Sequence, residues 1–171
     1  MERPGHSRMN RPSPGSVVIA LIAAVLVVGL AYKIADALKS DETRIREAVE
    51  NVARYTREQD PGAVLECFDP EYHDAFGYTF PEVRRMANVL LRTSIGAAAE
   101  AEVLSIVKID GDVAVVRVRA AGRLEFKEGK TLTLKDAGIR TNTFEVDLRR
   151  FKGTFRLTSL RPLEPREGAD P

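Results

Sequence analysis

The sequence predicts an α+β domain, with helices on one face of an antiparallel sheet and one membrane-spanning segment before it. Apolar residues recur every three or four positions between residues 45 and 91, the period of amphipathic helices. From Glu102 onward they alternate with polar residues, the period of half-buried strands. An uncharged apolar run from Val17 to Tyr32 precedes both regions. Helices followed by a meander of strands form two packed layers.

Composition and charge exclude several classes of protein. The chain has 171 residues, 44% hydrophobic and 30% charged, which is enough apolar material for one packed core. The first 40 residues carry a net charge of +3, so the remaining 131 carry −2. Nucleic-acid binding depends on concentrated positive charge, and we therefore expect no nucleic-acid partner. The single cysteine excludes an intrachain disulfide.

The N-terminal apolar run predicts a membrane anchor at residues 16–33. Its 16 strongly apolar residues are slightly fewer than the roughly 17–25 that span a bilayer. Snorkelling by Lys33, and Tyr32 as an aromatic anchor at the lipid headgroups, can make up the difference. Three arginines precede the run, so the positive-inside rule places residues 1–15 in the cytoplasm. We expect a single-pass protein of a bacterial cell membrane, with its C-terminal domain outside the cytoplasm.

A cleaved signal peptide is the alternative interpretation of this segment. Ala35-Asp36-Ala37 resembles a small-residue cleavage site, and cleavage would release a secreted domain. The apolar run is longer than a typical signal-peptide core of about 7–15 residues, which favours the retained anchor. In that interpretation residues 34–40 form a linker. Either interpretation places the domain outside the cytoplasm.

Two helices are predicted between residues 41 and 68. Ser40 precedes the first helix, and the acidic Asp41 and Glu42 suit its N-terminus. The inward stripe of this helix consists of Ile45, Val49, Val52 and Tyr55. Asp60 is expected to cap a short second helix, with Pro61 at its first position. Its inward residues are Val64, Leu65, Cys67 and Phe68.

A third helix is predicted after residue 79. Thr79 and Glu82 have the spacing of a capping box, in which each side chain satisfies a backbone amide of the first turn. We expect Gly96 to end the helix. Its inward residues are Val83, Met86, Ala87, Leu90 and Leu91.

The first predicted hairpin turns at Asp110-Gly111, because a two-residue turn needs residues that tolerate a positive φ. In the strand that follows, small apolar residues occupy one face, which suits contact with a helix. These residues are Ala114, Val116, Val118 and Ala120. Gly122 indicates a β-bulge in the same strand.

The rest of the chain predicts a short strand and a final hairpin. A turn at residues 127–130 leads to a strand at 131–134. The final hairpin turns at Lys152-Gly153, with Phe144, Val146, Leu148, Phe155 and Leu157 on its inward face. Residues 163–171 are rich in Pro, Gly and charge, which predicts a disordered tail.

Residues 41–162 resemble the NTF2-like (SnoaL-like) superfamily. The resemblance rests on the order of the elements, on "VLECFDPEY" after the second helix, and on "FEVDLRRFKGTFRLTSL" at the end. Phe155 stands where many members have a tryptophan. The resemblance implies a cone-shaped curved sheet that closes over three helices around a pocket. Members of this superfamily include enzymes, such as ketosteroid isomerases, cyclases and dehydratases. Other members are non-catalytic binding and assembly domains, some of them membrane-tethered. The resemblance therefore implies one of these two kinds of function.

The stretch from Glu66 to Tyr78 concentrates the residues with reactive side chains. The resemblance implies a catalytic base near Asp74 and a hydrogen-bond donor on the first helix, where Tyr55 lies. A carboxylate among aromatic rings has a raised pKa, which suits a general base. The alternative is structural: Asp69 and Asp74 hold turns, and the rings fill the cone. The candidate ligand-binding residues are Tyr55, Tyr72, His73, Asp74, Phe76 and Tyr78.

Other chemistries have weaker support in the sequence. Cys67 and His73 would have to meet as an activated pair, yet Cys67 lies on the packing side of a short helix. The stretch from Glu66 to Tyr78 has one histidine, His73, and the chain has no C-x-x-C motif, so the sequence does not predict a metal site and we expect no cofactor. The arginines of the strands alternate with acids, which favours a solvated, cross-strand-paired face over an anion site. These arginines are Arg117, Arg119, Arg149 and Arg156.

The sequence therefore predicts a membrane-anchored, exported NTF2-like domain that binds without catalysis. Its expected occupant is a small apolar ligand or a protein partner from the cell envelope. Homodimerisation is a third option, because Val113 and Val115 point outward on the sheet. The alternative function is an isomerase, cyclase or dehydratase that uses Asp74 as its base and Tyr55 as its donor.

Overall fold

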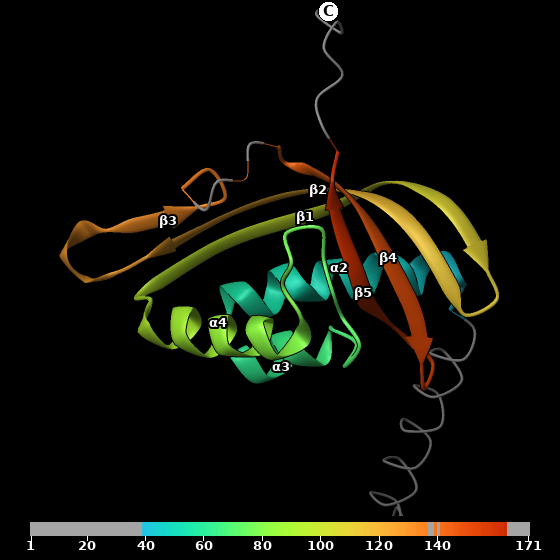
Figure 1. The fold of residues 1–171 in the computed structure, drawn as a ribbon, viewed down its shortest axis with the longest axis horizontal. Coiled ribbons are helices and arrows are strands. Elements are labelled where there is room, and N and C mark those ends of the chain that lie inside the picture. Colours follow the sequence, from blue (N-terminus) through green and yellow to red (C-terminus); the bar gives the residue numbers. More distant parts are fainter. Residues whose placement is uncertain (1–38, 137–138, 140, 164–171) are drawn as a thin grey trace, which may run out of the picture. The chain divides into compact units, whose positions relative to one another are not determined.

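The computed structural model describes residues 39–136, 139 and 141–163. The predicted anchor at 16–33, most of the linker after it and nearly all of the predicted tail lie outside this part of the chain. Within the described part, no helix is both long enough and apolar enough to cross a membrane. Three helices lie on one side of a curved antiparallel sheet, which confirms the α+β prediction (Figure 1).

Helix α2 (Asp41–Arg57) begins where the sequence predicts. The Ser40 hydroxyl oxygen accepts a hydrogen bond from the amide of Thr43 at 3.2 Å, and so satisfies one free amide of the first turn. Ile45 and Val49 of the predicted stripe are buried, because this face of the helix packs on β1.

Helices α3 (Pro61–Glu66) and α4 (Phe80–Thr93) also have the predicted caps. The Asp60 carboxylate accepts a hydrogen bond from the amide of Ala63 at 3.0 Å. At α4, the Glu82 carboxylate accepts hydrogen bonds from the amide and the hydroxyl of Thr79 at 2.7 and 2.8 Å. These local caps are legible in the sequence because each one joins residues only three positions apart.

The sheet has the order β1-β2-β4-β5, and all neighbours are antiparallel. Strand β3 pairs with the C-terminal part of β2, whereas β4 pairs with its N-terminal part. The short 3₁₀ helix η1 (Lys127–Gly129) precedes β3. The strands are β1 (Gly96–Asp110), β2 (Val113–Glu125), β3 (Thr131–Thr133), β4 (Thr143–Phe151) and β5 (Thr154–Pro162).

Three predictions for the strands are wrong in detail. Gly96 begins β1 rather than ending α4, which stops at Thr93. Asp110 pairs with Val113, so the first hairpin turns at Gly111-Asp112, one position later than predicted. Gly122 pairs regularly with β1, and the two register shifts fall in β1 instead, between Val103 and Ser105 and between Ile106 and Lys108. A bulge in β1 disrupts one ladder only, because β1 is an edge strand.

The core fills the space between the helices and the concave side of the sheet. The predicted inward faces of β2, β4 and β5 are buried, which confirms the alternation seen in the sequence. Ile45, Leu148 and Val116 are among the largest fully buried side chains. The buried cluster consists of Ile45, Ala48, Val49, Tyr72, Val103, Ala114, Val116, Val118, Phe144, Val146, Leu148, Phe155 and Leu157.

Other segments bond to part of each outer strand of the sheet. At β1, Arg46 and Arg57 of α2 donate hydrogen bonds to the carbonyls of Val103 and Ala99 at 3.2 and 2.6 Å. At β5, the segment between α3 and α4 runs along the strand, and amides of this segment donate to β5 carbonyls. Covering an edge in this way blocks pairing with another chain. It also fixes the position of the stretch that the sequence singles out.

Candidate functional site

The stretch from Glu66 to Tyr78 joins α3 to α4 and pairs with β5. The amides of Asp69, His73 and Ala75 donate hydrogen bonds to the carbonyls of Leu157, Thr158 and Leu160 at 2.8, 3.1 and 3.0 Å. Phe68 forms a parallel bridge with Leu157. The stretch is thus bonded to the sheet through its backbone, and its side chains have defined positions.

Asp69 forms a buried ion pair that the sequence does not reveal. Its side chain is only 2% exposed, and Arg149 of β4 donates to both carboxylate oxygens, at 2.6 Å from Nη2 and 3.2 Å from Nε. The amide of Glu71 donates a third hydrogen bond at 2.9 Å. Burial alone would raise the pKa of Asp69, but these hydrogen bonds and the positive charge of Arg149 lower it below its usual value. Asp69 is therefore an ionised structural anchor.

Asp74 holds the turn that leads into α4. One carboxylate oxygen accepts hydrogen bonds from the amides of Phe76 and Tyr78 at 2.9 and 2.8 Å. The other accepts the hydroxyl of Tyr72 at 3.1 Å. Gly77 completes the turn with a φ of 88°, a conformation that favours glycine. The structure thus gives Asp74 the turn-holding role, and a catalytic or ligand-binding role for it stays a prediction.

The two tyrosines of the predicted site lie in different surroundings. Tyr72 is buried in the core, and its ring contacts that of Phe68 edge-on at 5.0 Å between centroids. Burial and the neighbouring charge of Asp74 raise the pKa of Tyr72. Tyr55 is half-buried on α2, and its hydroxyl oxygen accepts a hydrogen bond from Arg54 at 2.8 Å. Neither Tyr55 nor Asp74 lines either of the two pockets described below.

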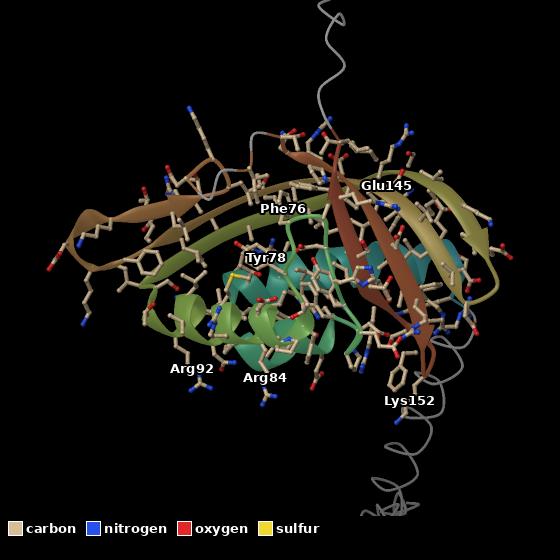
Figure 2. The ribbon with its side chains drawn as sticks, in the orientation of Figure 1. Phe76, Tyr78, Arg84, Arg92, Glu145 and Lys152 are labelled. Atoms are coloured by element: carbon tan, nitrogen blue, oxygen red, sulfur yellow. The ribbon has the colours of Figure 1, made fainter. Side chains whose placement is uncertain are left out.

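Phe76, Tyr78 and His73 lie at the surface. Phe76 is 40% exposed and Tyr78 is 43% exposed, and both belong to the loop between α3 and α4 (Figure 2). The His73 ring is also exposed. These three side chains are accessible to a ligand or a partner, and none of them lines either of the two pockets described below.

Cys67 has the character of a core residue. It is buried, and its thiol lies 3.5 Å from the carbonyl oxygen of Ala63. Burial and the negative charge of Glu66 raise the pKa of Cys67 to about 11, so the thiol is protonated at neutral pH. Among the described residues, no group of three or more metal-ligating side chains comes together.

The arginines of the strands have different partners. Arg119 pairs across the strands with Glu102 at 3.5 Å, as a solvated face predicts. Arg149 instead pairs with the buried Asp69. Arg117 and Arg156 form no ion pair within the described part of the chain. Both of these unpaired arginines line pockets.

A pocket of about 1020 Å³ opens where β3 and β4 leave part of β2 uncovered. Strand β3 pairs with β2 up to Arg123, and β4 pairs with it from Arg119, so residues 120–122 lie in a gap between the two strands. We call this the sheet-gap pocket. It is lined by Leu104, Ser105, Arg117, Ala120, Ala121, Gly122, Thr133, Leu134, Lys135, Ile139, Thr141, Asn142, Thr143 and Leu163.

One feature of the sequence, Gly122, is an indirect signal for the sheet-gap pocket. Gly122 interrupts a strand of larger residues, and a glycine within a strand often marks an irregularity or a close approach. The prediction placed a bulge there, whereas the structure leaves an uncovered stretch of strand. The rest of the lining is ordinary in type and comes from distant parts of the chain, so spacing alone could not assemble it.

The fold is similar to that of several solved structures. An NTF2-like protein with a cystatin-like fold from Novosphingobium aromaticivorans has a TM-score of 0.54 at 16% identity, over 83% of this chain and 92% of its own. A type 2 hexachlorocyclohexane dehydrochlorinase, LinA, has a TM-score of 0.55 at 12% identity, over 80% and 97%. An NTF2-like superfamily protein from Salmonella enterica serovar Typhimurium has a TM-score of 0.53 at 13% identity, over 74% and 94%.

These similarities show that the domain has the NTF2-like fold. Identities this low do not carry function from one protein to another, since this fold supports both enzymes and binding domains. No family model and no curated protein matches the sequence.

Proposed function

We propose that this chain is a non-catalytic binding module, anchored in a membrane by residues 16–33 and exposing its NTF2-like domain outside the cytoplasm. Its ligand is a small, largely apolar molecule held in the sheet-gap pocket. The observation that carries the proposal is the pocket itself. At about 1020 Å³ it matches the upper end of ligand pockets, which span roughly 300–1,000 Å³.

The lining of the sheet-gap pocket suits a small apolar ligand. Leu104, Leu134, Ile139 and Leu163 offer apolar surface. A few polar groups, including Ser105 and Arg117, can fix the orientation of a ligand, which is the usual arrangement of such sites.

The hydrogen bonds of the candidate catalytic groups support a non-catalytic role. The Asp74 carboxylate already accepts three hydrogen bonds within its own loop. The Tyr55 hydroxyl oxygen accepts from Arg54. A general base must reach the proton of its substrate, and an oxyanion donor must point to the reacting atom. Neither Tyr55 nor Asp74 lines the sheet-gap pocket or the second pocket described below, which also supports a non-catalytic role.

The proposed ligand can be tested by extracting it from the purified protein and by filling the pocket with a larger side chain. We expect mass spectrometry of the purified full-length chain to recover a bound small molecule. Ala121→Phe should abolish its recovery, because Ala121 is exposed in the sheet-gap pocket. Ala98→Phe is the matched control, since Ala98 is an exposed sheet residue outside the lining. Equal loss in both variants, or no bound molecule in either, contradicts the proposal.

The anchor and its orientation are tested with the full-length chain in its own membrane. We expect the protein to resist extraction with alkaline carbonate. A cysteine at Lys127, which is exposed in η1, should react with an impermeant maleimide in intact cells, whereas one at Ser7 should react only after lysis. The native Cys67 is buried and should contribute little background. Carbonate extraction, or the reverse labelling pattern, overturns this part of the proposal.

A protein partner is a second candidate occupant of the domain. Three apolar side chains near the turn of the β1–β2 hairpin are 42–50% exposed: Val107, Ile109 and Val113. Exposed apolar residues that cluster are typical of interaction surfaces. Photo-crosslinking from Ile109 in the native membrane distinguishes an envelope partner from a second copy of this chain. Absence of any product from this position excludes the surface as an interface.

An enzyme with Asp74 as base is the alternative function. The hydrogen bond between Tyr72 and Asp74, at 3.1 Å, is the observation in its favour, because it pairs a hydroxyl with a half-buried carboxylate. The fold also occurs in a dehydrochlorinase. We would incubate the recovered ligand with wild type and with Asp74→Asn. Turnover by wild type that is lost in the variant supports the enzyme and overturns the non-catalytic proposal.

A further inference from the structure

A second pocket lies at the corner where α3, α4 and β5 meet, and it is independent of the proposed function. Its volume is about 310 Å³, at the small end of ligand pockets. Leu65, Phe68, Pro70 and Phe80 form its apolar lining. Its charged residues are Arg84, Arg156 and Glu66. We call it the corner pocket.

Arg156 brings an unsatisfied polar group to the corner pocket. It lies on β5 between Phe155 and Leu157, whose side chains are buried in the core. Its guanidinium group stacks on the ring of Phe151, with the central carbon 4.3 Å from the ring centroid. The Nε atom is buried and has no hydrogen-bond partner in the described structure. A buried donor without an acceptor is unfavourable, so an acceptor that reached this atom would be stabilised.

Arg84 adds a second positive charge to the same pocket. It lies on the exposed side of α4, one turn after the start of the helix (Figure 2). Neither Arg84 nor Arg156 forms an ion pair with any described residue, and neither pairs with Glu66. Two guanidinium groups and one carboxylate give the lining a formal charge of +1, although the ionised Asp69 outside the lining interacts electrostatically with Arg156 and offsets part of its charge. Arg84 has no acidic partner within ion-pair distance in the described structure, so the exposed side of the pocket suits a monoanion.

We propose that the corner pocket binds a small amphipathic monoanion, an aromatic or short aliphatic carboxylate. The apolar body of the ligand lies against Leu65, Phe68 and Phe80, and its carboxylate accepts hydrogen bonds from Arg156. Arg84 supplies the second charge at the exposed side. Hydrogen bonds between guanidinium and carboxylate groups are short and charge-assisted, so they select an anion over a neutral molecule of the same shape.

Benzoate and benzamide test the charge requirement, because they share a ring and differ in charge. We would titrate each into the full-length chain in detergent by calorimetry, and subtract titrations into detergent alone. We expect benzoate to bind at least about tenfold more tightly than benzamide, because only benzoate forms the charge-assisted contact. Equal affinities, or no binding of benzoate, overturn the proposal.

Three matched arginine variants locate the site. Arg156→Gln and Arg84→Gln should each weaken benzoate binding by at least about fivefold and leave benzamide unchanged. Arg92→Gln is the control, because Arg92 is exposed on the same helix but does not line the pocket. Circular dichroism checks that each variant is folded. If Arg156→Gln does not fold, the benzoate affinity of Arg84→Gln, a variant of an exposed residue, tests the proposal. An equal loss in Arg92→Gln contradicts the proposal.

The sheet-gap pocket provides the last control. Arg117→Gln removes a positive charge from that pocket and should leave benzoate binding unchanged. If Arg117→Gln abolishes benzoate binding while Arg156→Gln retains it, the anion binds in the sheet-gap pocket and the present proposal fails. Neither result bears on the proposed membrane anchor or its orientation, which other experiments test.

Discussion

The Glu66–Tyr78 stretch and the sheet-gap pocket differ in how their polar groups are satisfied. In the stretch, the carboxylates of Asp69 and Asp74 accept hydrogen bonds from their own loop and from Arg149. In the pocket, Arg117 and Lys135 form no ion pair with described residues. The cluster of reactive residues in the stretch therefore satisfies its carboxylates within the fold, whereas the sheet-gap pocket has two cationic side chains without an ion pair among the described residues.

The largest expected effect comes from breaking the buried ion pair of the stretch. Asp69→Asn should lower the free energy of unfolding by about 2–4 kcal/mol, because it removes the charge that pairs with Arg149. We expect the lower end of this range, because Arg149 is 43% exposed and water screens its attraction to Asp69. Urea denaturation followed by circular dichroism measures the change. Glu71→Gln is the control, because its partly solvated pair should contribute less than about 1 kcal/mol.

The same pair predicts how stability depends on pH. The folded pKa of Asp69 is lower than the unfolded value of about 3.9, so its contribution is present above that value. It is lost as the pH falls through the folded pKa. We expect the stability difference between wild type and Asp69→Asn to be full at pH 6 and to shrink as the pH falls below 4. A difference that stays constant from pH 6 to pH 2 would show that the charge plays no part.

A smaller effect is expected in the turn before α4. Asp74→Ala should cost about 1–2 kcal/mol, because the amides of Phe76 and Tyr78 and the Tyr72 hydroxyl lose their acceptor. Asp74→Asn keeps one acceptor oxygen and should cost less. Thermal unfolding of both variants tests the order. If Asp74→Ala is as stable as wild type, the carboxylate does not hold the turn, and its geometry must serve a ligand.

The smallest effect on stability is expected in the sheet-gap pocket. Arg117→Gln should change the free energy of unfolding by less than about 0.5 kcal/mol, because Arg117 is exposed and unpaired in the described structure. It should nevertheless weaken binding of the ligand recovered with the purified chain. A loss of stability comparable to that of Asp74→Ala would mean that this pocket, like the stretch, is built for structure.

Local interactions account for the parts of the fold that were predicted correctly. Ser40, Asp60 and Thr79 cap their helices through contacts three positions away. The last hairpin turns at Lys152-Gly153, where both residues have a positive φ, as predicted. The strand alternation predicted the buried faces because one side of this sheet packs on helices. Each of these features depends on residues that are only a few positions apart in the sequence.

Predictions that depended on pairing were less accurate. The β1–β2 turn shifted by one position, since Asp110 pairs with Val113. The bulges occurred in β1 rather than at Gly122, because register is set by both strands together. The role of Arg149 was also missed. Its strand position suggested a solvated arginine, whereas its partner Asp69 lies 80 positions away in sequence.

The two-layer α+β architecture, the helix caps, the inward faces of the strands and the burial of Cys67 could all be predicted from the sequence. These depend on period and short-range hydrogen bonding, which one segment encodes alone. The tertiary structure decided that Asp69 pairs with Arg149, that Tyr72 enters the core, and where the two pockets lie. Those outcomes depend on which distant side chains come within contact distance, and only the packed sheet and helices set these distances.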